Sequence, residues 1–466
     1  MRQQTKTIPA QIVAIRLDTL SGSADKRDVI TCRTGRMIGG ARVGWPKRQT
    51  NLNLLGLPMR KFSVLVASLP LFLSVGRVAP FANTLNNLVP DIFAAVDVVS
   101  RELVGFIPAA DRDSNDERAA LGELIRWPKV PELPAGDTTP AMAIPEPTDM
   151  TVGSDTMSIT KSRNVPFGFT GEERKGLNNG VGALTIQGYA IAQALRTLTN
   201  EMETDLALAA RLAASRATGT AGTTPFATNL GDSAQVRKIL DDNGAPASPR
   251  SLIVNTATGA SLRTLGQLTK ANEVGDAMTV RDGELINLHN FSIKESGALG
   301  SMVTKGTNNG SASTNNAGYA IGATVITLAS AGTGNILAGD VITFAGDTNK
   351  YLVVSGDADV SGGGTITIAA PGLRQAIAAS NTVITTGASY APNVAFSRNA
   401  LRLITRAPAL PEEGDAAFDR MTVVDPRSGI AFEFAIYLGY KKVRYEVAMA
   451  WGVKATKAEH IALLLG

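Results

Sequence analysis

The stretch that most constrains the fold is the run at 184–215, LTIQGYAIAQALRTLTNEMETDLALAARLAAS. Apolar side chains recur in it at spacings of three and four, which predicts one uninterrupted amphipathic helix. At 1.5 Å per residue the helix would be roughly 45–50 Å long, well beyond most globular helices. We expect a structural strut, although an ordinary long core helix would give the same pattern. The predicted apolar stripe is Ile191, Leu195, Leu198, Met202, Leu206, Ala209 and Ala213, and the predicted polar face is Arg196, Asn200, Glu203 and Arg211.

Composition argues against most catalytic chemistry. Cys32 is the only cysteine, which excludes an internal disulfide and any multi-cysteine metal site. His289 and His460 are 171 positions apart (460 − 289), in no metal-binding spacing, and the sequence has no GxSxG, Walker-type or HExxH motif. Glu172 and Glu173 could form an acid–base pair, but the basic residues after them favour a solvated charge cluster. We therefore expect no enzyme, metal or cofactor.

Positive charge is concentrated at the start of the chain. Residues 1–81 hold 13 Lys and Arg against 3 Asp, which leaves 32 basic residues (45 − 13) against 38 acidic ones (41 − 3) in the remainder. A basic nucleic-acid-binding surface is therefore not expected in the main body. Residues 59–75 resemble a signal core, but Pro70 interrupts an apolar run too short to span a membrane. The extension could be processed, used as a signal, or lie upstream of the true start, and we favour the last.

Two segments precede the long helix. Residues 87–110 show helical spacing of apolar residues, which suits either a helix packed on its own domain or an arm that reaches a neighbour. Residues 111–170 are charged and punctuated by prolines, with strand-like pieces near 123–127 and 157–160. Because a structureless segment of this length is unusual inside a compact domain, we expect a long hairpin or loop that leaves the body to contact something else.

Beyond the long helix the pattern alternates. A helix at 233–243, a strand at 251–255 and a helix at 258–268 predict a mixed α/β region. The α/β pattern resumes at residue 393, where a helix-to-strand segment at 396–408 precedes three strands within 419–455. A turn at 425–429 joins two of these strands.

Residues 297–389 interrupt this region with a composition rich in Gly, Thr, Ser, Ala and Val. Short strands separated by turn residues predict an inserted small all-β barrel or sandwich. The predicted strands are 324–328, 341–344, 351–354, 365–369 and 383–386.

Acidic residues in this insert raise the question of a metal site. The segment ILAGDVITFAG at 336–346 is bounded by Gly-Asp pairs, and we interpret Asp340 and Asp347 as turn formers that could also contact other subunits. DADVSGG at 357–363 opens like a calcium loop, but Ile368 stands where a bidentate Glu should close the ligand shell. A polar hairpin turn is the favoured interpretation.

The order of these segments resembles the major capsid protein of tailed bacteriophages, the Hong-Kong-97-like fold, and especially coat proteins of short-tailed phages that carry an inserted β-barrel domain. The resemblance covers residues 82–466 and is carried by ANTLNNLVPDIFAAVDVVSRELVGFIPA, AQVRKILDDNGAP, LAGDVITFAGDTNKYLVV, NVAFSRNALRLITRAP and YEVAMAWGVKATKAEHIALLLG. It implies an α+β fold. The implied parts are an N-terminal arm at 82–110, an extended loop at 111–170, a spine helix with peripheral domain at 171–232, an axial domain at 233–296 and 390–419, an inserted β-domain at 297–389, and peripheral strands with the C-terminus at 420–466.

The resemblance also implies a function. Copies of the chain would assemble into hexamers and pentamers that form an icosahedral shell around double-stranded DNA, with a scaffolding protein and a portal as assembly partners. The protein would be found in the virion capsid, and in the host cytoplasm during assembly. Some relatives crosslink this loop through a Lys–Asn isopeptide bond, and Lys129 and Lys161 lie in it here, but relatives with an insert do without crosslinks. The candidate assembly contacts are Arg126, Trp127, Lys129, Glu172, Glu173, Arg174, Asp340, Asp347 and Lys350.

Three alternatives make different predictions. A phage tail or cell-surface protein with an Ig-like adhesion module would form monomers or trimers, and it leaves the strut and the long loop unexplained. An enzyme with a calcium-bound β-domain would have to bind calcium. An encapsulin-like cargo shell shares the fold class but usually lacks such an insert.

Overall fold

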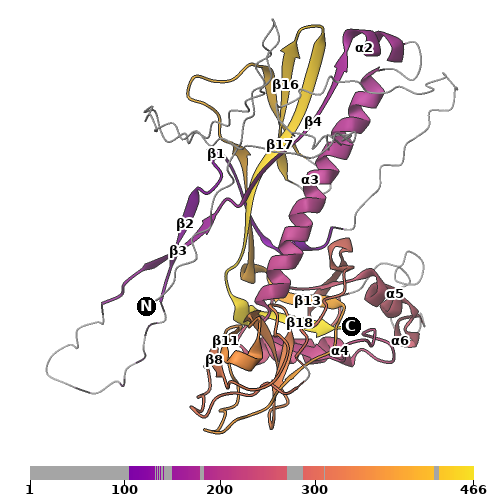
Figure 1. The fold of residues 1–466 in the computed structure, drawn as a ribbon. Coiled ribbons are helices and arrows are strands. Elements are labelled where there is room, and N and C mark those ends of the chain that lie inside the picture. Colours follow the sequence, from indigo (N-terminus) through magenta and orange to yellow (C-terminus); the bar gives the residue numbers. More distant parts are fainter. Residues whose placement is uncertain are drawn as a thin grey trace, which may run out of the picture. The chain divides into compact units, whose positions relative to one another are not determined.

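The computed structural model describes residues 104–131, 149–178, 183–269, 287–308, 310–424 and 430–466, together with positions 133, 135, 137 and 140 (Figure 1). The extension at 1–81, the predicted arm up to residue 103 and the predicted turn at 425–429 lie outside the described residues. Within them the chain mixes helices and strands, as the sequence predicts.

A long helix and a six-stranded sheet form the first part of the fold. Helix α3 (Ala183–Ala213) confirms the predicted long helix and packs along β17 and β4 (Figure 1). The sheet has the order β1-β14-β17-β16-β15, and β4 also pairs with β17. Its strands are β1 (Asp111–Ala119), β4 (Lys161–Thr170), β14 (Leu401–Pro408), β15 (Ala417–Val424), β16 (Ala431–Gly439) and β17 (Lys442–Ala455).

The core between helix and sheet follows from the helical stripe. Leu198, Met202 and Leu206 are almost fully buried and lie in one cluster with Trp451 of β17. Farther along the sheet, the ring of Tyr445 stacks on neighbouring aromatic rings whose centroids lie 5.3 and 5.9 Å away. Each fully buried large apolar side chain contributes about 1.5–3 kcal/mol to the free energy of unfolding. The packing of α3 on the six-stranded sheet therefore dominates the stability of this region.

Strands β1 and β4 were not predicted, since the strand-like patterns in this segment lie only near 123–127 and 157–160. β1 has the polar sequence DRDSNDERA, which lacks the apolar alternation that signals a strand. Parallel pairing with β14 holds it in the sheet, together with ion pairs from Arg402 to Asp111 and from Arg406 to Asp113. β4 pairs with β17 from Lys161 to Thr170. The segment 111–170 thus begins and ends inside the sheet.

A second, larger sheet carries the α/β part. Its order is β12-β9-β10-β5-β18-β13-β6-β7, and buried residues of α4 and α5 share a core with β6, β7 and β18. The predicted helix at 258–268 is two helices, α5 and the short α6. The elements are β5 (Arg216–Gly219), α4 (Gly231–Asp242), β6 (Arg250–Val254), α5 (Thr256–Thr264), α6 (Gly266–Thr269), β7 (Phe291–Glu295), β13 (Pro392–Ser397) and β18 (Ile461–Leu465).

The prediction of a helix at the start of 396–408 is wrong. The chain instead leaves β13, makes the short 3₁₀ helix η3 (Arg398–Ala400) and enters β14. Pairing explains the difference, because β13 lies between β18 and β6 with both edges hydrogen-bonded. All the side chains of β13 are buried, so sheet burial overrides the local helical spacing.

All five strands predicted between 324 and 386 are present, and β9 has the predicted bounds. Pairing runs β8-β11-β10-β9-β12. Residues 312–315 lie between the two ends of this series: Thr314 donates to the carbonyl of Thr382 beside β12, and Asn315 donates to that of Thr327 in β8. Hydrogen bonds therefore run around a complete circuit that encloses its own apolar core. The strands are β8 (Val325–Leu328), β9 (Val341–Phe344), β10 (Lys350–Ser355), β11 (Gly364–Ile368) and β12 (Ile384–Thr386).

This circuit is not separate from the rest of the fold. Along one edge of β10, Lys350 and Tyr351 pair with β5, whereas Val353 and Ser355 pair with β11. One strand thus belongs to both structures, and the second sheet continues directly into the insert.

Candidate functional site

The strand pair β2 (Leu124–Lys129) and β3 (Gly153–Ser158) is the feature that most clearly calls for a partner. The two strands form a separate two-stranded sheet. An isolated two-stranded pair is marginal in water and buries few side chains of its own. Apolar side chains on and beside the pair are exposed, and exposed apolar groups that gather in one region mark protein-interaction surfaces. They are Leu121, Leu124, Val130, Leu133, Met150 and Val152.

One part of this strand pair, which we call its root, consists of Trp127, Asp155 and Met157 and is held by other residues of the same chain. The guanidinium of Arg402 lies 4.6 Å from the ring centroid of Trp127, and the ammonium of Lys454 lies 5.7 Å from it. Lys454 also forms an ion pair of 2.6 Å with Asp155, and this hydrogen bond lowers the pKa of the Asp155 carboxyl. Beside it Met157 is buried in a small apolar cluster with residues of β1, β14 and β17. The root is fixed, whereas the apolar side chains beyond it are uncovered.

The predicted contact residues of β2 also comprise exposed side chains and one side chain that anchors the strand pair. Arg126 and Lys129 are exposed, so their side chains are available to a neighbour. Trp127 is half-buried between Arg402 and Lys454, so its first role is to anchor the strand pair within the chain.

Of the two lysines considered for crosslinking, Lys161 is already engaged. Its ammonium contacts Asp205 at 2.9 Å and Glu201 at 3.0 Å, both on α3. Although burial opposes it, hydrogen bonding to these carboxylates raises the pKa of Lys161. Because amide formation requires a neutral amine, this ion pairing disfavours Lys161 as a crosslinking residue and makes it a tie between β4 and α3.

Glu172, Glu173 and Arg174 lie in helix α2 (Gly171–Leu177), which follows β4. Glu173 and Thr170 form a capping box: the Thr170 side chain accepts from the Glu173 N–H, and the Glu173 carboxylate accepts from the Thr170 N–H. This reciprocal pair fixes the start of the helix. The side chains of Glu172 and Arg174 are exposed, in keeping with the predicted solvated charge cluster.

Asp340 and Asp347 act as turn formers at either end of β9, as predicted. The carboxylate of Asp340 accepts from the backbone N–H groups of Gly306 and Leu337, at 2.8–3.1 Å. Asp347 accepts from the N–H of Asn349 and the hydroxyl of Tyr351. Asp340 is only 2% exposed, and these hydrogen bonds give it a role inside this chain. A subunit contact at Asp340 or Asp347 stays a prediction.

The loop at 357–363 is organised by its own hydrogen bonds. Asp357 accepts from the N–H of Asp359, and Asp359 in turn accepts from the N–H and the hydroxyl of Ser361. These are the bonds of a polar turn. In the described parts of the chain, no group of three or more His, Cys, Asp or Glu side chains is placed to share a metal ion. Over the same residues, no helix is long and apolar enough to cross a membrane.

Glu203 on α3 is a functional residue that sequence reasoning missed. It was assigned to the polar face, but it is fully buried. Its carboxylate accepts from the N–H groups of Gly105, Phe106 and Ile107 at 2.6–3.0 Å and from the hydroxyl of Ser296 at 2.7 Å. These four donors satisfy the buried carboxylate and tie the end of the predicted arm and the residue before the insert to α3. The sequence signal that could have indicated its burial is that Glu203 directly follows Met202 of the apolar stripe.

A search of solved structures finds similar chains from phages. A chain from Mycobacterium phage Che8 is 15% identical, with 81% of this chain and 97% of that chain covered and a TM-score of 0.40. The capsid of cyanophage P-SCSP1u is 10% identical, with 80% and 91% covered and a TM-score of 0.43. The mature capsid of bacteriophage PhiM1 is 9% identical, with 79% and 89% covered and a TM-score of 0.40. No protein-family model and no curated protein matches the sequence.

Proposed function

We propose that this chain is the major capsid protein of a tailed bacteriophage, with a Hong-Kong-97-like fold and an inserted β-barrel domain. The observation that carries the proposal is the β2–β3 pair, which is anchored by Trp127 and Asp155 but leaves apolar side chains uncovered. A pair built in this way gains its cover from another molecule. In this proposal the other molecule is a neighbouring copy of the same chain.

The remaining parts suit a shell subunit. Helix α3 is a long strut braced on the six-stranded sheet by apolar burial and by the Lys161 ion pairs. Hexamers and pentamers need contacts between different surfaces of neighbouring copies that close into rings. Each such contact can be weak, because a subunit in a shell makes many of them at once. The insert would decorate the shell and brace neighbouring subunits.

Partners and location follow from this role. The shell would enclose double-stranded DNA without reading its sequence, and assembly would use a scaffolding protein and a portal. The chain would be found in the host cytoplasm during assembly and then in the virion. It would catalyse no reaction, bind no cofactor and have no membrane-embedded part.

Expression of the full chain with and without a scaffolding partner, followed by electron microscopy, tests the proposal. The expected result is closed shells with fivefold and sixfold clusters of subunits when the scaffold is present. Monomers or trimers under every condition would contradict the proposal and favour a tail or adhesion protein. Shells that form without a scaffold and enclose a protein cargo would favour an encapsulin-like function.

A further inference from the structure

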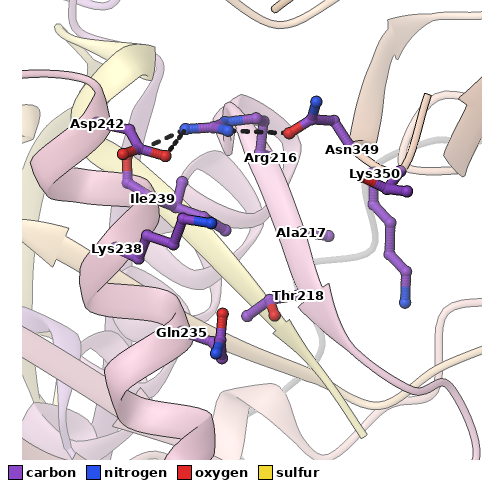
Figure 2. Close-up of a pocket in the computed structure, with 10 residues that line it drawn as sticks. Arg216, Ala217, Thr218, Gln235, Lys238, Ile239, Asp242, Asn349 and Lys350 are labelled. Carbon is purple, nitrogen blue, oxygen red and sulfur yellow. Dashed lines mark hydrogen bonds and ion pairs between the residues drawn. The ribbon is translucent and has the colours of Figure 1, made fainter.

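A polar crevice of about 200 Å³ lies where the insert meets the second sheet. Two of its walls are Thr218 on β5 and Gln235 and Lys238 on α4 (Figure 2). The third is Thr348, in the turn before β10. The crevice exists because the β5–β10 ladder consists of two residue pairs and ends at Lys350. Beyond that pair the turn separates from β5, and the space between them stays open.

One wall of the crevice is fixed in place. Arg216 is 5% exposed, and its guanidinium donates to Asn349 at 3.1 Å and pairs with Asp242 at 3.3 Å (Figure 2). Asn349 is held in turn by a hydrogen bond to Asp347. The geometry is thus set before any ligand arrives, which lowers the cost of binding.

The charges around the crevice do not balance. Arg216, Lys238 and Lys350 are cationic, whereas Asp242 is the one carboxylate in the lining and is already paired with Arg216. Lys350 pairs with Ala217 across the β5–β10 ladder, so its side chain lies on the opposite face of β5 from Arg216 and Thr218, and there it donates to the carbonyl of Gly219. Lys238 is therefore the cation of the crevice that has no acidic partner among the lining residues.

The crevice also offers unused hydrogen-bond donors. The side chains of Thr218, Gln235, Lys238 and Thr348 have no hydrogen-bond or ion-pair partner in the described part of the chain. Two hydroxyls, an amide and an ammonium around one hollow match an acceptor with several oxygens. Since a water molecule takes up about 30 Å³ in the liquid, the space holds a group several times larger.

We propose that this crevice binds a phosphate group, which joins the turn before β10 to β5 and α4. Phosphate carries between one and two negative charges near neutral pH and presents several strong acceptor oxygens, so it matches the four donors, among which Lys238 supplies the unbalanced positive charge. Free phosphate and the phosphodiester of a nucleic acid share this chemistry. The inference does not depend on the shell function.

Titration of the full chain with inorganic phosphate, followed by calorimetry and by ³¹P line broadening, tests the proposal at constant ionic strength. A parallel titration uses a short single-stranded oligothymidylate. The test variant is Lys238→Gln, whose exposed side chain makes no structural contact. The matched control is Lys441→Gln, which removes the same charge at the β16–β17 turn. Circular dichroism checks that both variants fold.

We expect at least one probe to bind. Lys238→Gln should weaken that binding about tenfold or more, since one charge-assisted bond is worth that factor. Lys441→Gln should bind about as tightly as the wild type. Binding of inorganic phosphate identifies the free ion as sufficient. Binding of the oligonucleotide alone assigns the crevice to phosphodiesters. Binding of neither probe, or equal weakening in both variants, would overturn the proposal.

Discussion

The β2–β3 pair and the β-circuit of the insert differ in how they treat their apolar residues. The circuit runs from β8 to β12, closes through residues 312–315, and keeps side chains such as Ile342 and Ile366 fully buried. The strand pair has a fixed root at Trp127 but leaves Leu121 and Val130 each 66% exposed. Closure of a β-structure removes free edges and creates an interior, whereas two strands cannot enclose one.

This difference indicates that the two regions have different structural requirements. The circuit obtains its stability from its own residues, so its structure does not require a neighbour. The strand pair is complete only at its root, and its outer surface becomes buried when another molecule covers it. The same chain thus carries one region that is complete in itself and one that, under the proposed function, associates with another copy.

The largest expected effect is a core truncation in the circuit. Ile366→Ala removes a fully buried side chain from β11 and should lower the free energy of unfolding of the insert by about 2–5 kcal/mol. Leu124→Ala in β2, where the side chain is 55% exposed, should change stability by about 0.5 kcal/mol at most. Chemical denaturation of both variants measures the contrast. Equal losses would show that the strand pair has a core of its own.

A smaller effect is expected at the root of the strand pair. Trp127→Ala removes the ring that contacts Arg402 and Lys454, and it should destabilise β2 and β3 locally by about 1–2 kcal/mol. Hydrogen exchange of β2 and β3 measures this, with the insert as an internal reference. Trp127→Phe, which keeps an aromatic face, is the control and should retain part of the protection. Unchanged exchange in Trp127→Ala would place the anchor elsewhere.

Acidification should affect the two regions in opposite directions. Ion pairing lowers the pKa of Asp155, so the stability this residue gives to the root is present above its ordinary pKa of 3.8 and is lost as pH falls through the lower folded value. Burial raises the pKa of Asp340, so its contribution to the insert is present below 3.8 and is lost as pH rises through the higher folded value. Exchange rates corrected for intrinsic pH dependence measure both trends.

Two amide variants serve as the controls for this pH experiment. Asp155→Asn should remove the acid sensitivity of the root, and Asp340→Asn should remove the pH dependence of the insert. A parallel response of both regions in the wild-type chain would show that other titrating groups dominate.

The smallest effect on the isolated chain is expected on the outer surface of the strand pair. The double variant Leu121→Ser with Val130→Ser should shift the free energy of unfolding by about 0.5 kcal/mol or less, because both side chains are exposed. It should nevertheless abolish shell formation seen by electron microscopy. Leu121→Met with Val130→Ile keeps the surface apolar and should still assemble. Normal shells from the serine variant would remove the strand pair from the assembly surface.

Patterns of side-chain spacing predicted much of the fold. Helix α3 and the strands of the insert follow from helical spacing and from short apolar runs between turn residues. β1 was missed because its polar residues are held by pairing with β14, a long-range contact that leaves no local pattern. β18 was missed because its short apolar run IALLL fits a buried helix as well as a buried strand.

The candidate site was less predictable than the fold. Lys350 was named as a candidate contact, but the face of β5 on which its side chain lies depends on how β10 pairs with β5. Glu203 was assigned to the wrong face because its partners are backbone N–H groups from about a hundred residues earlier. Such contacts are set by tertiary packing, which the spacing of residues along the chain does not record.

The double pairing of β10 has a consequence for protein engineering. Removal of the whole insert would take away the strand that covers β5, so the backbone groups of Ala217 and its neighbour would be left at a free sheet edge open to aggregation. Foreign peptides are better placed in the exposed turn around Ser361, where both the circuit and the shared strand stay whole. Peptide insertion into the loops of the insert should therefore be tolerated better than replacement of the whole insert.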